Sequence, residues 1–211
     1  MRPQTEWISP FYAHYIIPKR YLKCSLLIFG HNYSMNQKSR FVLYAVFPQT
    51  IERLNEVLEQ SPSDVQLIIE NCAGMGNQIG ASFKEIGKIL KALGNARVQV
   101  CLDTQHSFAA GYDVATKDGL EKTIEEFDKE IGLEHLVAVH ANDSKIAFAG
   151  GVDRHENIGD GLIGLKGFEI IMSHVAFREV PFFLEVPGVE RNGPDEENIN
   201  RLKSIRGDLG I

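Results

Sequence analysis

The chain has 211 residues, of which 44% are hydrophobic and 24% charged, and its formal net charge is −6. This length and composition fit one globular domain with a sizeable core. No apolar run approaches the roughly 20 residues that span a bilayer, so no membrane partner is expected, and the negative charge gives no general attraction to nucleic acid.

The N-terminal sequence MRPQTEWISP lacks the apolar centre of a signal peptide. Cys24, Cys72 and Cys101 are scattered and show no C-x-x-C spacing, which argues against a disulfide framework and for a reducing compartment. We therefore expect a cytoplasmic protein in which Cys72 and Cys101 lie near strand ends as small apolar residues.

Residues 1–50 carry few signals of regular structure. The segments Ser25–Gly30 and Phe41–Phe47 are rich in β-branched and aromatic residues, which predicts two strands with a polar turn between them. A helix is predicted over Pro48–Gln60, because its apolar residues share one face and a proline stands near its start.

From Asp64 onward, predicted strands and helices alternate. Near-continuous apolar runs predict strands buried on both faces, at Val65–Ile69, Val98–Leu102, His135–Val139 and Pro181–Leu184. Amphipathic spacing predicts helices at Ser82–Leu93, Gly119–Ile131, Leu165–His174 and Asp195–Ser204. This alternation is typical of an α/β fold with parallel strands and right-handed crossovers.

Each of these strands leads directly into a side chain that can bind a metal ion or transfer a proton. The residues are Glu70, Asp103, His140 and Glu185. One such residue would be ordinary capping, but four from one ligand set indicate an active site at the carboxyl ends of the strands, as in a (β/α) barrel.

The loop within Val139–Gly161 holds two histidines and several carboxylates. Asp153 and His155 are two positions apart, so in an extended segment they project to the same side and can bind one ion. Imidazole and carboxylate suit zinc or a neighbouring divalent metal. Taken alone, the segment also fits a solvated polar loop. The chain has neither a glycine-rich phosphate-binding motif nor a nucleophile elbow.

Five segments carry a family resemblance when they are taken together. In chain order they are IIENCAG, CLDTQHSFAAGYD, HANDSK, VDRHENIGDGLIGLKGF and LEVPG. They resemble endonuclease IV, the zinc-dependent apurinic/apyrimidinic endonuclease family of base-excision repair. The resemblance covers residues 51–211 and leaves residues 1–50 as a divergent or truncated start. It implies a single xylose-isomerase-like (β/α)8 barrel of the TIM type over residues 1–211, incomplete at its N-terminus.

The resemblance implies a cluster of up to three zinc ions. Seven ligands are carried over by position: Glu70, Asp103, His106, His140, Asp153, His155 and Glu185. Glu70 would bridge two ions, and Glu185 would position or deprotonate the nucleophile, so these two are the implied catalytic residues. His106, Asp153 and His155 would bind one ion together.

The implied activity is hydrolysis of the phosphodiester 5′ to an abasic site, which leaves a 3′-hydroxyl and a 5′-deoxyribose phosphate. Metal ions stabilise the attacking and leaving oxygens in such a displacement. The partner would be double-stranded DNA that contains abasic sites, and the enzyme would be a monomer. Arg154 and Lys145 would lie near the DNA backbone, although each also fits a solvated surface charge.

The start of the chain departs from the family pattern. The family supplies two histidines to a further zinc from earlier strands, and His14 and His31 are the nearest, tentative candidates here. We expect this departure to impair activity. Two smaller departures are Gln105, where the family usually has cysteine, and Met75, where glutamine is common.

Two other interpretations stay open. A xylose-isomerase-like, metal-dependent sugar isomerase or epimerase shares acidic residues and histidines at strand ends, although the DRHENIG segment speaks against it. A non-catalytic, truncated barrel would bind metal or DNA weakly and would expose strand edges that favour aggregation.

Overall fold

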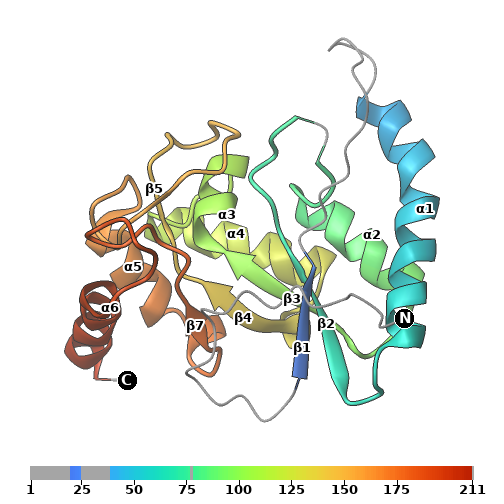
Figure 1. Ribbon diagram of the computed structural model, residues 1–211. Helices are drawn as coiled ribbons and strands as arrows, with labels where there is room; N and C mark the ends of the chain where they lie inside the picture. The colour runs from blue at the N-terminus through green and yellow to red at the C-terminus, as the bar shows by residue number, and fades with distance from the viewer. Residues whose placement is uncertain (1–19, 25–38, 77, 211) are drawn as a thin grey trace.

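The computed structural model describes residues 20–24, 39–76 and 78–210. Five parallel strands form one sheet in the order β1-β2-β3-β4-β7, side by side in chain order (Figure 1). Their bounds are Arg20–Cys24 (β1), Val65–Glu70 (β2), Val98–Asp103 (β3), Leu136–His140 (β4) and Phe182–Phe183 (β7). A separate antiparallel ribbon pairs β5 (Asp143–Ser144) with β6 (His155–Glu156).

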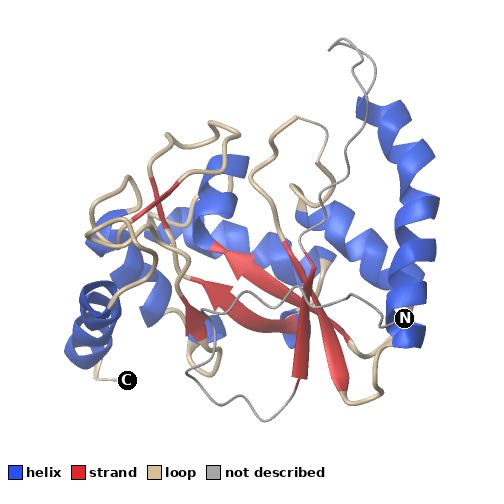
Figure 2. Cartoon of the chain, viewed as in Figure 1, coloured by secondary structure: helices blue, strands red, loops and turns tan. Residues whose placement is uncertain are grey.

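Helices connect the strands and pack beside the sheet (Figure 2). The longer ones are α1 (Ser39–Gln60), α2 (Phe83–Leu93), α4 (Lys117–Glu130), α5 (Gly164–Ser173) and α6 (Glu196–Leu209). Shorter ones are α3 (Thr104–Ala110) and the 3-10 turns Leu133–His135 and Val175–Phe177. None of the described helices is both long enough and apolar enough to cross a bilayer.

The predicted α/β class with a parallel sheet is confirmed. The predicted strands and helices after residue 64 all form, with ends that differ by a few residues. Local caps explain several of the boundaries: α2 begins at the Ser82 hydroxyl, which accepts from the Glu85 N–H, and ends at Gly94 with a left-handed φ of 54°. The structure adds α3 and the β5–β6 ribbon, which were not predicted.

The predicted strand at Phe41–Phe47 is wrong, because these residues belong to α1. A short apolar run does not distinguish a strand from a buried helix. Phe47, Ile51, Leu54 and Leu58 follow helical spacing and pack into the core, so tertiary contacts favour the helix, and the helix continues through Pro48. The predicted strand at Ser25–Gly30 lies outside the described residues, and β1 precedes it.

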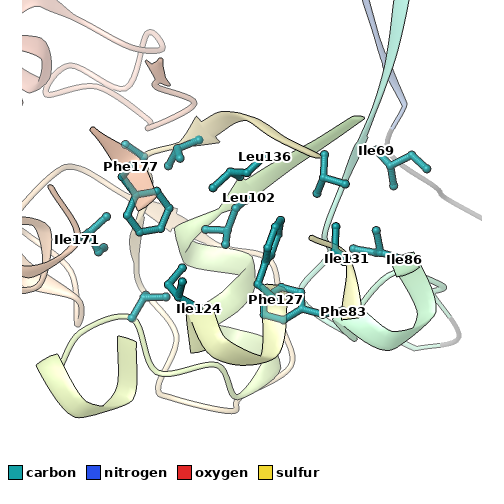
Figure 3. Packing of buried hydrophobic residues seen from close by; sticks show 14 of the residues in the cluster. Ile69, Phe83, Ile86, Leu102, Ile124, Phe127, Ile131, Leu136, Ile171 and Phe177 are labelled. Carbon is teal, nitrogen blue, oxygen red and sulfur yellow. The ribbon is translucent and has the colours of Figure 1, made fainter. Parts of the chain in front are cut away.

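The core lies between the sheet and the helices (Figure 3). Phe127 of α4 is fully buried, and its ring meets that of Phe83 of α2 edge-on, with centroids 5.2 Å apart. The same helices also meet at Gly87, where a Cβ atom would lie 1.9 Å from the Glu130 carbonyl oxygen. Only glycine permits that approach, so this contact fixes the spacing of α2 and α4.

The other face of the sheet carries a smaller apolar layer. Ile68, Cys101 and Ala138 are buried there, and Phe183 packs against them. Side chains two positions apart on a strand share a face. The next residues on this face are therefore the four at the strand ends: Glu70, Asp103, His140 and Glu185. The apolar layer thus forms the floor of a polar site.

Candidate metal centre

The strand ends bring four side chains to one place. Ligand-type atoms of Glu70, Asp103, His140 and Glu185 all lie within 4.8 Å of one another, and we call these residues the carboxylate-rich cluster. His140 Nδ1 lies 2.7 Å from Glu70 Oε1 and 3.3 Å from Glu185 Oε2. Because Asp103 and His140 are paired across β3 and β4, the strand register itself sets their spacing.

A second group lies beside the first. It comprises His106, Asp153 and His155, which we call the His–Asp–His cluster. His106 Nε2 is 3.3 Å from Asp153 Oδ2, His155 Nε2 is 3.3 Å from Asp153 Oδ1, and the two Nε2 atoms are 3.5 Å apart. Asp103 joins the two groups, because it also forms a ligand set with His106 and His155.

These distances fit a shared ion. Four ligands placed tetrahedrally about zinc, at about 2.0–2.1 Å each, lie about 3.3–3.4 Å from one another. The three distances within the His–Asp–His cluster are 3.3, 3.3 and 3.5 Å. An ion therefore fits between these side chains with little rearrangement, and the donor set of imidazole and carboxylate is one that zinc accepts.

Backbone carbonyls orient both histidines of the His–Asp–His cluster. His106 Nδ1 lies 2.8 Å from the Asn71 carbonyl oxygen, and His155 Nδ1 lies 3.1 Å from the Glu185 carbonyl oxygen. A carbonyl only accepts, so in each neutral ring Nδ1 carries the proton and Nε2 has the free lone pair. Both Nε2 atoms then face Asp153 as ligand atoms.

Short contacts hold Asp103 from two sides. As the N-cap of α3, its Oδ1 accepts from the His106 N–H at 2.8 Å. Its Oδ2 accepts from Asn142 Nδ2 at 2.6 Å, while Asn142 Oδ1 accepts from the Glu185 N–H at 2.8 Å. The fully buried Asn142 thus ties two members of the carboxylate-rich cluster together.

Asp143 organises the loop that leads to α5. Its fully buried carboxylate accepts from five backbone N–H groups, those of Ser144, Gly159, Gly161, Ile163 and Gly164, at 2.7–3.2 Å. Gly161 is required there, because a Cβ atom would lie 2.4 Å from Asp143 Oδ1. Helix α5 has no side-chain N-cap of its own, so Asp143 supplies the acceptor for its first turn.

Electrostatics favour protonated histidines while no cation is bound. Burial lowers the pKa of His106, but the nearby carboxylates of Asp103, Asp153 and Glu70 together outweigh that effect. They raise the pKa of His106 to about 10. Burial also lowers the pKa of His140, but its contacts with Cys101 and Glu70 raise it to about 11. The His106 hydrogen bond lowers the pKa of Asp153 below its usual range. The site thus attracts positive charge.

The structure brings together all seven ligands expected from the sequence, while their roles toward an ion stay predictions. Lys145 is half exposed and lies 3.7 Å from Glu156, and the Arg154 guanidinium donates to the Asp153 carbonyl oxygen at 2.8 Å. His14 and His31 lie outside the described residues. Sequence reasoning gave no role to Asn71 or Asn142, and it counted Asp143 only among the loop carboxylates that suit a metal, whereas in the structure Asp143 accepts from backbone N–H groups.

Cys72 and Cys101 are free thiols, as the sequence predicted. Cys101 is buried on the inner face of β3, two residues before Asp103, and burial raises the pKa of its thiol. Cys72 follows the end of β2 by two residues.

Comparisons with known proteins agree with this fold. The sequence profile of the xylose isomerase-like TIM barrel family matches residues 20–205. A probable endonuclease 4 from Halothermothrix orenii is 44% identical over 154 residues, which cover 72% of this chain and 55% of the relative. The crystal structure of endonuclease IV from Thermus thermophilus gives a TM-score of 0.65 at 31% identity, covering 77% of this chain and 57% of that chain.

A D-tagatose 3-epimerase-like protein gives a TM-score of 0.61 at 15% identity, over 90% of this chain and 63% of that chain, and this likeness concerns the fold alone. The chain spans about half the length of the curated relatives that it matches.

Proposed function

The chain belongs to the xylose isomerase-like TIM barrel family, and from this premise we propose that it is a metal-dependent endonuclease of the endonuclease IV type. Its substrate is double-stranded DNA with abasic sites, and it hydrolyses the phosphodiester on the 5′ side of the lesion. The observation that carries this proposal is the convergence of seven carboxylate and imidazole ligands in two adjoining clusters, in a chain that is 44% identical to a probable endonuclease 4 over 154 residues.

In this proposal the two clusters bind one zinc ion each. The carboxylate-rich cluster would bind one through its three carboxylates and His140, and the His–Asp–His cluster would bind the other. Glu70 would also serve a further ion, for which His14 and His31 are the candidate partners. The zinc ions would supply Lewis acidity to the phosphate and would activate water for attack.

The protein side chains have separate parts in this reaction. Glu185 is the most exposed member of the carboxylate-rich cluster, with 21% of its side chain accessible, and it would position or deprotonate the attacking water. The Glu70 side chain is only 2% accessible, and its Oε1 contacts His140 Nδ1 at the buried end of the cluster. Lys145 and Arg154 stand beside the clusters and would contact the DNA phosphates.

We also propose that the enzyme is a monomer and that it works in a reducing compartment, the cytoplasm. The free thiols of Cys72 and Cys101 support that location. A sugar isomerase or epimerase is the rival function, because the same fold and ligand types serve it. The identity to probable endonuclease 4 favours the nuclease, whereas the likeness to the epimerase-like protein extends to the fold alone.

A nicking assay tests the proposal. The substrate is a duplex with one tetrahydrofuran abasic site, incubated with the zinc-loaded chain, and the controls are an undamaged duplex and added chelator. We expect chelator-sensitive cleavage 5′ to the lesion, at a rate below that of a full-length relative, and loss of cleavage in Glu185→Gln. Absence of cleavage together with metal-dependent aldose–ketose conversion would refute the nuclease and support the rival.

A further inference from the structure

Gln105 occupies an unusual place for a long polar side chain. It is fully buried in the first turn of α3, one residue before His106. Its Nε2 donates to the Val152 carbonyl oxygen at 3.1 Å and to Ser144 Oγ at 3.4 Å. Val152 directly precedes Asp153, and Ser144 pairs with His155 in the β5–β6 ribbon. One amide group therefore reaches the segments that carry all three members of the His–Asp–His cluster.

The surrounding contacts fix which end of the amide points inward. The Val152 carbonyl only accepts, and Ser144 Oγ already donates to the Ile146 carbonyl oxygen at 2.7 Å. Ser144 Oγ also accepts from the Ile146 N–H at 3.1 Å and keeps a second lone pair, so both partners can only accept from the amide, and Nε2 faces them. As a consequence Gln105 Oε1 is buried and has no hydrogen-bond partner.

An unpaired buried acceptor costs stability. An apolar side chain of the same length would fill the space without that cost. What distinguishes glutamine here is therefore its donor end, which is directed at the loop that carries Asp153.

The neighbouring loop contacts show why a donor is useful at this point. The Ala149 and Gly151 N–H groups donate to carbonyl oxygens of α3, at 3.0 and 2.9 Å. These bonds hold the middle of the loop between β5 and β6, at Ala149 and Gly151, against the C-terminal end of α3. Toward Asp153, two side chains of α3 contact this segment: Gln105 donates to the Val152 carbonyl oxygen, and His106 lies against Asp153 itself. One ion can touch both residues only when their ligand atoms are close, and His106 Nε2 lies 3.3 Å from Asp153 Oδ2.

We propose that Gln105 is a positioning residue that sets the distance between His106 and Asp153 and thereby tunes the metal affinity of the His–Asp–His cluster. The inference rests on the metal-binding part of the proposed function. It does not depend on the identity of the substrate, since the residue acts on the ligands and not on DNA.

The test compares Gln105→Met with Gln99→Met as a matched control. Gln99 also donates its amide to a backbone carbonyl, that of Ala96 at 3.0 Å, and its Oε1 is also unpaired, but it lies near the start of β3, away from the site. Zinc binding is measured without DNA, by competition with a chromogenic chelator. Loss of a hydrogen bond that orients a metal ligand lowers metal affinity about 10- to 100-fold. We expect that loss for one ion in Gln105→Met and for none in Gln99→Met.

His106→Ala identifies which ion is affected. The double variant Gln105→Met/His106→Ala should bind zinc as His106→Ala alone does, because both changes act on one cluster. The melting temperature of the zinc-free Gln105→Met chain should stay near that of the wild type, while its zinc-induced rise should shrink. If Gln105→Met proves unfolded, Gln105→Leu replaces it as an alternative apolar side chain in the same space.

Wild-type zinc affinity in the Gln105 variants, or an equal loss at both clusters, would overturn the inference. A wild-type chain that binds zinc but leaves abasic DNA intact would refute the proposed function and leave this inference standing. Cleavage of abasic DNA together with unchanged zinc affinity in the Gln105 variants would support the proposed function and refute this inference.

Discussion

The loop between the β5–β6 ribbon and α5 should depend on the charge of one residue, and Asp143→Asn removes that charge with almost no change of shape. Two of the five backbone donors reach only Oδ1, two reach only Oδ2, and one reaches both. An asparagine offers one oxygen acceptor. Whichever way its amide lies, two backbone N–H groups that the carboxylate satisfied face another donor; these belong to Gly159 and Gly161 in one orientation and to Ser144 and Ile163 in the other.

The magnitude follows from that count. An unsatisfied buried donor costs about 1–3 kcal/mol, so the substitution should lower the free energy of unfolding by about 2–6 kcal/mol. Urea denaturation of the zinc-free protein, followed by circular dichroism, measures it. Asp160→Asn is the control on the same loop, because that side chain is 50% exposed and its ion pair with Arg201 should contribute at most about 1 kcal/mol. If Asp143→Asn unfolded within about 0.5 kcal/mol of the wild type, the carboxylate would not organise the loop.

Three further predictions concern proton release, the pH dependence of stability and helix packing. Zinc should release protons at neutral pH, because His106 and His140 have pKa values raised to about 10 and 11 and bind metal only as neutral rings; calorimetric heats that do not depend on the buffer would contradict this. In the zinc-free protein these raised values imply a stabilisation that is complete below the unfolded pKa of about 6.5 and is lost as the pH rises through 10 to 11, which urea titrations across pH can follow. Gly87→Ala should destabilise the protein by about 1–3 kcal/mol through the clash with Glu130, and Gly207→Ala, with nothing within 4 Å, should be neutral or slightly stabilising; equal denaturation midpoints for the two variants would refute the packing account.

The sheet and the four strand-end ligands were predictable from the sequence because they depend on local patterns. Near-continuous apolar runs marked β2 and β3 as strands buried on both faces, and both end at an acidic residue. Once strands are parallel, their carboxyl ends meet at one edge, so Glu70 and Asp103 had to be neighbours. No long-range information was needed for that inference.

The parts that were missed depend on contacts between distant segments. Helix α3 has seven residues, too few to establish a helical period, and its evident signal was an acidic N-cap at Asp103. The role of Asp143 arises only when the loop closes, since four of its donors lie 16 to 21 residues away in the sequence. The helix at Phe41–Phe47 was mistaken for a strand because packing, and not residue preference, decides its form.

The two ligand clusters form one unit, and Asp103 is the reason. Its Oδ1 caps α3 by accepting from the His106 N–H. Its Oδ2 lies 3.9 Å from His140 Nδ1 and 3.8 Å from His155 Nε2. Since β3 runs directly into α3, one peptide segment sets the positions of Asp103 and His106 together. An ion in either cluster would draw on the same carboxylate and would compensate charge that the other cluster also feels. Occupation of the two clusters should therefore be coupled, so a change in one cluster should lower zinc affinity mainly in that cluster and to a smaller extent in the other.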